Sequence, residues 1–277
     1  MHETARHPPC AKSARKDGAL TAWLCQGKAG PPAIGIMKNG QTSALISLTF
    51  DDGLRCQFES AVPILDQRRL PATFFLTANT APAHVDWCGH PCWRKITWSE
   101  SDIQLLRGLI QRKHEIGSHS VWHMFPEPGP IFCRDFNPQF EVEESKRLIE
   151  GWLDEKISSF GYPFYRKPVP LKNSVIAAGY KQARAGATGL SYYSPQESLD
   201  SFDVDCRQIM ANENVGEWVR PGRWHILTFH GIGGEHDGWF PISVPEFSRQ
   251  MAELAKRRDS GAVEVVTFKD GADRLRM

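Results

Sequence analysis

The sequence has 277 residues, of which 41% are hydrophobic and 23% charged, enough apolar material for one large α/β domain with its own core. Its 33 lysines and arginines nearly balance its 32 aspartates and glutamates, so no strong field draws nucleic acid or an anionic membrane surface. No apolar stretch approaches the roughly 20 residues that cross a bilayer. The sequence therefore predicts no membrane span and favours a neutral small molecule or a carbohydrate as partner.

The N-terminal part differs in composition from the rest. Residues 1–42 are rich in Ala, Gly, Pro, Lys and Arg and lack a hydrophobic period, so we expect a loose extension there and a folded domain over 43–277. The apolar stretch 19–25 is too short for a convincing signal peptide. Seven cysteines without regular spacing indicate reduced thiols and a cytoplasmic location.

From Thr42 onward, short β-branched runs alternate with amphipathic stretches, a pattern typical of an α/β fold with mainly parallel strands. Ser99 and Asp102 form a capping box that predicts a helix reaching about Arg112, and Ser243 begins the last long helix. A polar insertion at 79–97 precedes the first of these helices. We expect further helices at 57–67 and 140–153, and strands at 44–50, 72–76, 115–118, 159–162, 182–185, 224–229 and 263–267.

Three polar clusters directly follow predicted strands, which is where an α/β barrel places its active site. Each alone is explained as well by a common turn, a chance pair of histidines or a hydrogen-bonded core histidine. Together, two imidazoles and a carboxylate form a ligand set for a hydrolytic divalent ion and leave room for water and substrate. The clusters are Asp51-Asp52-Gly53, His119 to His123, and His230-Gly231.

Four motifs occur in an order that resembles the polysaccharide deacetylase family, which is carbohydrate esterase family four and has the NodB homology domain. The resemblance covers roughly residues 43–272 and implies a distorted (β/α) barrel of about seven parallel strands, with 43–277 as the catalytic domain. The motifs are Thr49-Phe50-Asp51-Asp52-Gly53, His119-Ser120 with His123, Tyr162-Pro163-Phe164, and Leu227-Thr228-Phe229-His230.

The resemblance also implies roles for these residues. Asp51 would be the general base that deprotonates a metal-activated water, and His230 the general acid that protonates the leaving group. One divalent ion is expected, zinc first, with cobalt, nickel or manganese as alternatives. Its ligands would be Asp52, His119 and His123.

The third motif, Tyr162-Pro163-Phe164, would contribute the oxyanion site through the backbone N–H of Phe164. Many family members carry an arginine three residues before the aromatic residue of this motif, where this chain has Gly161. The arginine that orients the base would then come from elsewhere or be absent. Arg207 is our candidate and Arg166 its competitor, with an exposed salt bridge as the alternative for either.

Other residues give weaker signals. Asp205 is a candidate carboxylate for keeping His230 protonated. Trp239 is the first candidate for stacking on a sugar ring, because it follows a polar segment directly after His230. Cys88 and Cys92 could bind metal, but free thiols are the default interpretation. Further aromatic candidates are Trp87, Trp93, Trp122, Phe125, Tyr165 and Phe240.

The leading functional hypothesis is metal-dependent removal of an acetyl group from a carbohydrate, N-acetyl before O-acetyl. A second is hydrolysis of another non-peptide C–N bond in a small linear or cyclic amide, because relatives with Tyr-Pro in the third motif and no arginine include such enzymes. A third is a non-catalytic carbohydrate-binding barrel, disfavoured because the ligands, base and acid are all present. The expected partner is a carbohydrate or a small amide.

Overall fold

A computed structural model describes residues 37–38, 41–78, 98–123, 136–186 and 200–275, all within the unit formed by residues 31–277. Its first element is an antiparallel hairpin of β1 (Met37–Lys38) and β2 (Gln41–Thr42). The predicted insertion 79–97, with Cys88, Cys92, Trp87 and Trp93, lies outside the described residues, and so does Phe125. No helix among the described residues has the length and hydropathy needed to cross a membrane.

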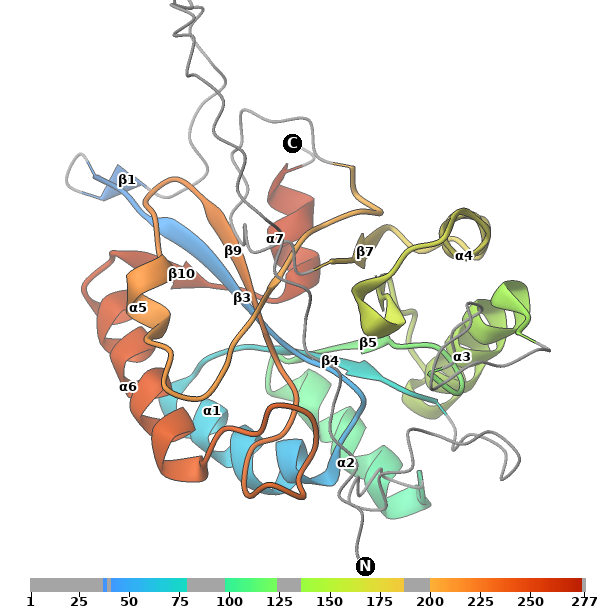
Figure 1. The fold of residues 1–277 in the computed structure, drawn as a ribbon, viewed down its shortest axis with the longest axis horizontal. Coiled ribbons are helices and arrows are strands. Elements are labelled where there is room, and N and C mark those ends of the chain that lie inside the picture. Colours follow the sequence, from blue (N-terminus) through green and yellow to red (C-terminus); the bar gives the residue numbers. More distant parts are fainter. Residues whose placement is uncertain (1–36, 39–40, 79–97, 124–135, 187–199, 276–277) are drawn as a thin grey trace, which may run out of the picture. The chain divides into compact units, whose positions relative to one another are not determined.

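The main sheet has eight strands, and every pairing between them is parallel (Figure 1). The strands are β3 (Ala44–Phe50), β4 (Thr73–Leu76), β5 (Glu115–Ser118), β6 (Ser159–Gly161), β7 (Gln182–Arg184), β8 (Arg207–Gln208), β9 (Trp224–Phe229) and β10 (Val263–Val265). Seven of them follow the order β7-β6-β5-β4-β3-β9-β8, and β10 pairs with the first half of β3.

The segment 201–208 joins the two ends of this strand order. Its first part bonds with β7, through Ala183 N to Ser201 O at 2.7 Å and Ala185 N to Val204 O at 2.8 Å. Its last part is β8, which pairs with β9. The sheet therefore curls back on itself, and the distorted (β/α) barrel with about seven parallel strands predicted from the sequence is confirmed.

Strand β3 shows how alternation places polar groups inside the curled sheet. Ile46, Leu48 and Phe50 belong to the main apolar core, and the Phe50 ring stacks on Phe74 and Phe229 at centroid distances of 5.0 and 5.3 Å. Successive side chains of a strand point to opposite faces. On the other face, Thr49 shares a 2.8 Å hydrogen bond with Thr228 of β9. Asp51, two residues after Thr49, points to that same polar face.

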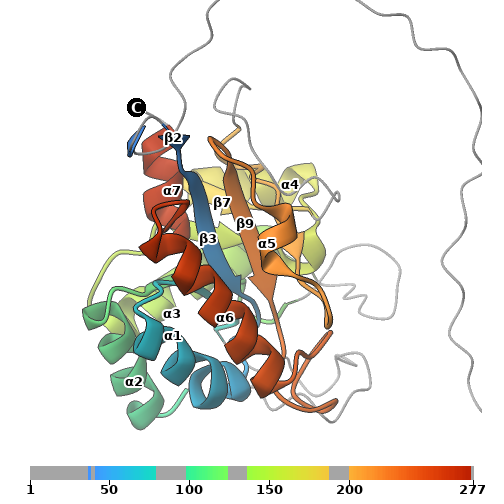
Figure 2. The same cartoon turned by 90° about the vertical axis from the view of Figure 1, so that its left-hand side faces the viewer.

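Helix α6 (Val244–Asp259) covers the outer side of the sheet and runs across β3 and β9 in Figure 2. Phe247 of α6 packs edge-on against Phe50 and Phe229, which joins this helix to the core. The helical elements are η1 (Gln57–Ala61), α1 (Val62–Arg68), α2 (Glu100–Gln111), α3 (Pro138–Leu153), η2 (Pro163–Tyr165), α4 (Val169–Ala177), α5 (Val215–Trp218), α6 (Val244–Asp259) and α7 (Phe268–Leu275).

The predicted elements agree with this structure to within a few residues, and the capping box of Ser99 and Asp102 is present. The helix expected at 57–67 differs, because it begins as the π-helical turn η1 before α1. Pro63 has no N–H and cannot make the α-helical bond at the junction. Helices α4, α5 and α7, the turn η2 and strands β1, β2 and β8 were not predicted; they are short, and prolines interrupt the pattern before α4.

Candidate active site

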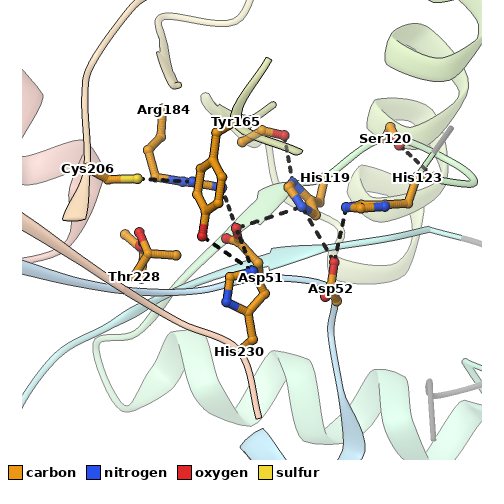
Figure 3. Close-up of polar contacts among 12 residues, drawn as sticks. Asp51, Asp52, His119, Ser120, His123, Tyr165, Arg184, Cys206, Thr228 and His230 are labelled. Atoms are coloured by element: carbon orange, nitrogen blue, oxygen red, sulfur yellow. Dashed lines mark hydrogen bonds and ion pairs between the residues drawn. The ribbon is translucent and has the colours of Figure 1, made fainter. Parts of the chain in front are cut away.

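Asp52, His119 and His123 converge at the carboxyl ends of β3 and β5. Their candidate ligand atoms all lie within 4.8 Å of one another, and all three side chains are buried. Asp52 Oδ1 is 3.6 Å from His119 Nε2 and 3.3 Å from His123 Nε2 (Figure 3). One carboxylate and two imidazoles are a donor set that suits zinc and similar divalent ions.

Neighbouring groups aim these side chains. His119 Nδ1 lies 2.7 Å from the carbonyl oxygen of Gly161, so this nitrogen donates its proton and Nε2 presents its lone pair to Asp52. Glu141 of α3 is buried, and its Oε2 accepts the N–H groups of Val121 and Trp122, each at 3.0 Å. The loop between the two histidines is therefore tied to a helix. The residues present fit a divalent ion in both ligand type and orientation.

Backbone strain is concentrated in the same place. Asp52, Ser120 and His123 have φ values of +77°, +71° and +56°, although none of them is glycine. Such conformations cost free energy and persist where the surrounding structure enforces them, which is common at functional sites. The hydroxyl of Ser120 accepts the N–H of His123 at 2.9 Å and helps to hold the strained turn.

Asp51 pairs with an arginine to which none of the motifs pointed. Arg184 Nη2 donates to Asp51 Oδ2 at 2.6 Å, and the two side chains are 0% and 2% exposed. Burial raises the pKa of Asp51 to about 7, although the Arg184 guanidinium opposes the shift. A carboxyl that changes charge near neutral pH is well matched to proton abstraction. Asp51 Oδ1 has no hydrogen-bond partner among the described residues.

Gly161 provides the space through which Arg184 reaches Asp51. Gly161 on β6 is the register partner of Arg184 on β7. A Cβ at position 161 would lie 2.9 Å from Arg184 Nη2, so that this group would have to move, and 3.1 Å from His119 Nδ1, which is a tight contact. The arginine missing from the third motif is thus replaced by one on the neighbouring strand.

The prediction that Arg207 orients Asp51 is replaced by this arrangement. Arg207 Nη2 donates to Glu213 Oε1 at 2.9 Å. Its strand, β8, places it in register with Leu227 in the middle of β9, whereas Asp51 follows the end of β3. Arg166, the alternative candidate, is exposed.

His230 follows β9 and faces Asp51, with Nε2 3.7 Å from Asp51 Oδ2. Burial and the Arg184 guanidinium lower the pKa of His230 to about 3, so the imidazole is neutral here. His230 Nδ1 has no hydrogen-bond partner among the described residues, so the structure does not place the predicted carboxylate of Asp205 on this nitrogen.

Gln57 joins Asp51 and His230 through their backbone carbonyl groups. This side chain is fully buried, and its Nε2 donates to Asp51 O at 2.5 Å and to His230 O at 3.0 Å. One amide therefore fixes the ends of β3 and β9 relative to each other. The sequence predicts only that a helix begins at Gln57, because a single glutamine is not part of a recognisable motif.

The third motif divides between core and site. Tyr162 is fully buried and its hydroxyl donates to Phe202 O at 3.2 Å, so its side chain belongs to the core and not to a substrate surface. Pro163 is also buried. Phe164 packs its ring 4.3 Å from that of His123, and its φ of +55° turns the chain sharply beside this histidine. Of the three residues predicted here, Phe164 is the one beside the site.

Trp239 lies next to the residue that follows His230, because its carbonyl accepts the N–H of Gly231 at 3.2 Å. Its ring is half-buried and neighbours that of Phe240, which is 47% exposed. Within the polar segment between His230 and Trp239, Asp237 Oδ2 accepts the N–H of Gly234 at 2.8 Å. A sugar-stacking role for Trp239 stays a prediction.

Comparisons with known proteins bear on the family and the fold of this chain. Residues 38–183 match the profile of the polysaccharide deacetylase family. No protein of curated function matches the sequence significantly. Among solved structures, peptidoglycan deacetylase PdaC from Bacillus subtilis is similar with 12% identity and a TM-score of 0.52, covering 87% of this chain and 94% of that one.

A second similar structure is the Xyl-CE4 domain of a multidomain xylanase from the hindgut metagenome of Trinervitermes trinervoides. It is 16% identical, with a TM-score of 0.50, over 82% of this chain and 89% of that one. At these identities the two structures support the fold. The family match spans more than half of the sequence, and the chain therefore belongs to the polysaccharide deacetylase family.

Proposed function

We propose that this protein is a metal-dependent hydrolase that removes an acetyl group from a carbohydrate, with an N-acetyl group as the favoured target. The observation that carries the proposal is the position of Asp51, whose Oδ2 lies 3.8 Å from His119 Nε2 and 3.7 Å from His230 Nε2. A base, an acid and a ligand trio therefore meet at one buried point. The similar Bacillus subtilis protein is named a peptidoglycan deacetylase, which agrees with this reaction class.

Asp52, His119 and His123 would hold the ion, with zinc expected before cobalt, nickel or manganese. When bound, a divalent ion lowers the pKa of a water molecule and polarises an acyl oxygen. The protein itself supplies the two side chains that transfer protons in this reaction, Asp51 and His230.

Asp51 is the proposed general base. Its Oδ2 is held by Arg184, so Oδ1 is the oxygen left to take a proton from the attacking water. With a pKa raised by burial to about 7, Asp51 is a stronger base than an exposed aspartate and is still ionised in part at neutral pH. Water attack at the acyl carbon places negative charge on the acyl oxygen, and the backbone N–H of Phe164 is the proposed donor to it.

His230 is the proposed general acid, donating from Nε2 to the leaving nitrogen or oxygen as its bond to the acyl carbon breaks. Burial and Arg184 keep the resting imidazole neutral. As negative charge develops on the substrate, Nδ1 takes up a second proton from solvent water, and loss of the Nε2 proton to the leaving group then returns the imidazole to its neutral form. Asp51 releases the proton that it took from the attacking water to solvent when the products leave. Acetate and the free amine or alcohol are the products.

The test is acetate release by the purified protein from three substrates: an N-acetylated chito-oligosaccharide, an acetylated xylan and a small acetylated amine that is not a sugar. We expect the chito-oligosaccharide to give the highest kcat/KM. A small cyclic ureide tested in parallel detects hydrolysis of other C–N bonds. Ureide hydrolysis without release of acetate from any glycan would contradict the proposal.

A further inference from the structure

Tyr165 is the residue of the site whose contacts the proposed function leaves unused. Its ring lies on the Arg184 guanidinium, with the ring centroid 5.0 Å from Cζ, while Phe75 lies 5.2 Å from the same carbon. Its hydroxyl is 3.4 Å from His230 Nε2 and donates to Gln208 Oε1 at 3.2 Å. Figure 3 shows this ring between Arg184 and His230. Tyr165 thus touches both the partner of the base and the acid.

An unusual backbone conformation places the Tyr165 ring here. Phe164 and Tyr165 have φ values of +55° and +60°, so two consecutive residues with side chains occupy the left-handed region. Each left-handed residue costs free energy, which favourable contacts of the surrounding structure must offset. The conformation sends the ring of Phe164 to His123 and that of Tyr165 to Arg184 and His230.

The hydrogen-bond direction determines which nitrogen of His230 carries a proton. A tyrosine hydroxyl has one hydrogen, and here it is given to the amide oxygen of Gln208. Its oxygen can then only accept from His230, which requires a proton on Nε2. Asp51 Oδ2, 3.7 Å from the same nitrogen, is a second acceptor that favours this tautomer.

We propose that Tyr165 is a positioning residue: through Gln208 and its own hydroxyl it holds His230 in the tautomer with the proton on Nε2, the atom that faces the reacting groups. That this proton goes to the leaving group rests on the proposed deacetylase function. The tautomer of His230 can be measured whatever the substrate is. Tyr165 acts through His230 and does not itself transfer a proton in this scheme.

The decisive variant is Tyr165→Phe, which keeps the ring on Arg184 and removes only the hydroxyl. Tyr180→Phe is the matched control, because Tyr180 is another buried tyrosine and packs against Phe160 and Lys146. Gln208→Leu is a second variant that removes the acceptor and frees the Tyr165 hydrogen to turn toward His230.

The first measurement is the ¹⁵N spectrum of the His230 ring nitrogens in the metal-loaded protein, identified by the signals lost in His230→Gln. We expect a proton on Nε2 in the unmodified protein and in Tyr180→Phe. In Tyr165→Phe and Gln208→Leu, the signals should move toward a mixture of the two tautomers. Unchanged ring signals in both of these variants would overturn the proposal, whether or not the protein deacetylates glycans.

The second measurement is steady-state kinetics on an acetamide and on an activated aryl acetate. We expect Tyr165→Phe to lower kcat for the amide by about tenfold, the effect of roughly one neutral hydrogen bond, with KM unchanged. The aryl acetate, whose leaving group needs little protonation, should react at nearly its normal rate. Equal losses on both substrates would overturn the positioning role, whereas a wild-type protein that releases no acetate refutes the proposed function alone.

Discussion

Arg184 on β7 and Asp51 after β3 are 133 positions apart in the sequence, yet Nη2 of one lies 2.6 Å from Oδ2 of the other inside the curled sheet. The contact exists because β7 and β3 turn their polar faces to the same interior and because Gly161 has no side chain between them. Asp51 is therefore held through Oδ2, and Oδ1 is the oxygen that would act on water in the proposed reaction.

Replacing Arg184 by Ala removes the positive charge that lowers the pKa of Asp51. Without it, burial and the neighbouring Asp52 act unopposed, so the pKa of Asp51 rises and the base is ionised only at higher pH. We expect the acid limb of the pH profile of kcat/KM to move upward. Arg184→Lys, which retains a charge, should shift it less. An acid limb that stays in place in Arg184→Ala would show that another group sets it.

Gly161→Ala tests the space that Arg184 uses. The added methyl would meet Arg184 Nη2 and the Phe75 ring at 2.9 Å and His119 Nδ1 at 3.1 Å. Overpacking of this kind costs about 1–3 kcal/mol of stability, and here we expect it to displace His119 and Arg184 as well. The melting temperature and the rate of acetate release should both decrease. Gly151→Ala on α3 is the control, because its methyl would meet nothing within 4 Å.

Much of the fold was predictable because strands and helices differ in the spacing of their hydrophobic residues along the sequence. That Asp52, His119 and His123 lie together near Asp51 and His230 was predictable because these five residues belong to three motifs that each directly follow a strand. Arg184 was not, since its role depends on a glycine in the neighbouring strand and on the curvature of the sheet. Gln57 and Glu141 act through single side chains on helices, which leave no pattern in the sequence. The cytoplasmic location and the domain boundary near residue 43 stay predictions.

Glu141 offers a test of the loop that carries the histidines. Glu141→Ala deprives the N–H groups of Val121 and Trp122 of their acceptor, so the loop between His119 and His123 loosens. Loss of such a supporting contact typically lowers metal affinity about 10–100-fold. Titration with a competing chelator measures the change. Glu143→Ala, an exposed residue of the same helix, should leave the affinity as it is.

Asp51→Asn and His230→Ala should separate base from acid. Asp51→Asn keeps the shape of the side chain but cannot accept a proton, so turnover should fall by about a hundredfold or more on every acetyl substrate. His230→Ala should impair an amide far more than an activated aryl acetate, which departs without protonation. Equal losses on amide and aryl ester in both variants would mean that these two roles are assigned wrongly.

The most direct test measures metal content and acetate release in the same preparation, for the unmodified protein and for a His119→Ala, His123→Ala double variant. We expect one divalent ion per chain in the unmodified protein, loss of acetate release on chelation, and its return when the ion is restored. The double variant, left with Asp52 alone of the trio, should retain little metal and no activity. Stoichiometric metal in the double variant, or full acetate release from a metal-free protein, would contradict the proposed centre.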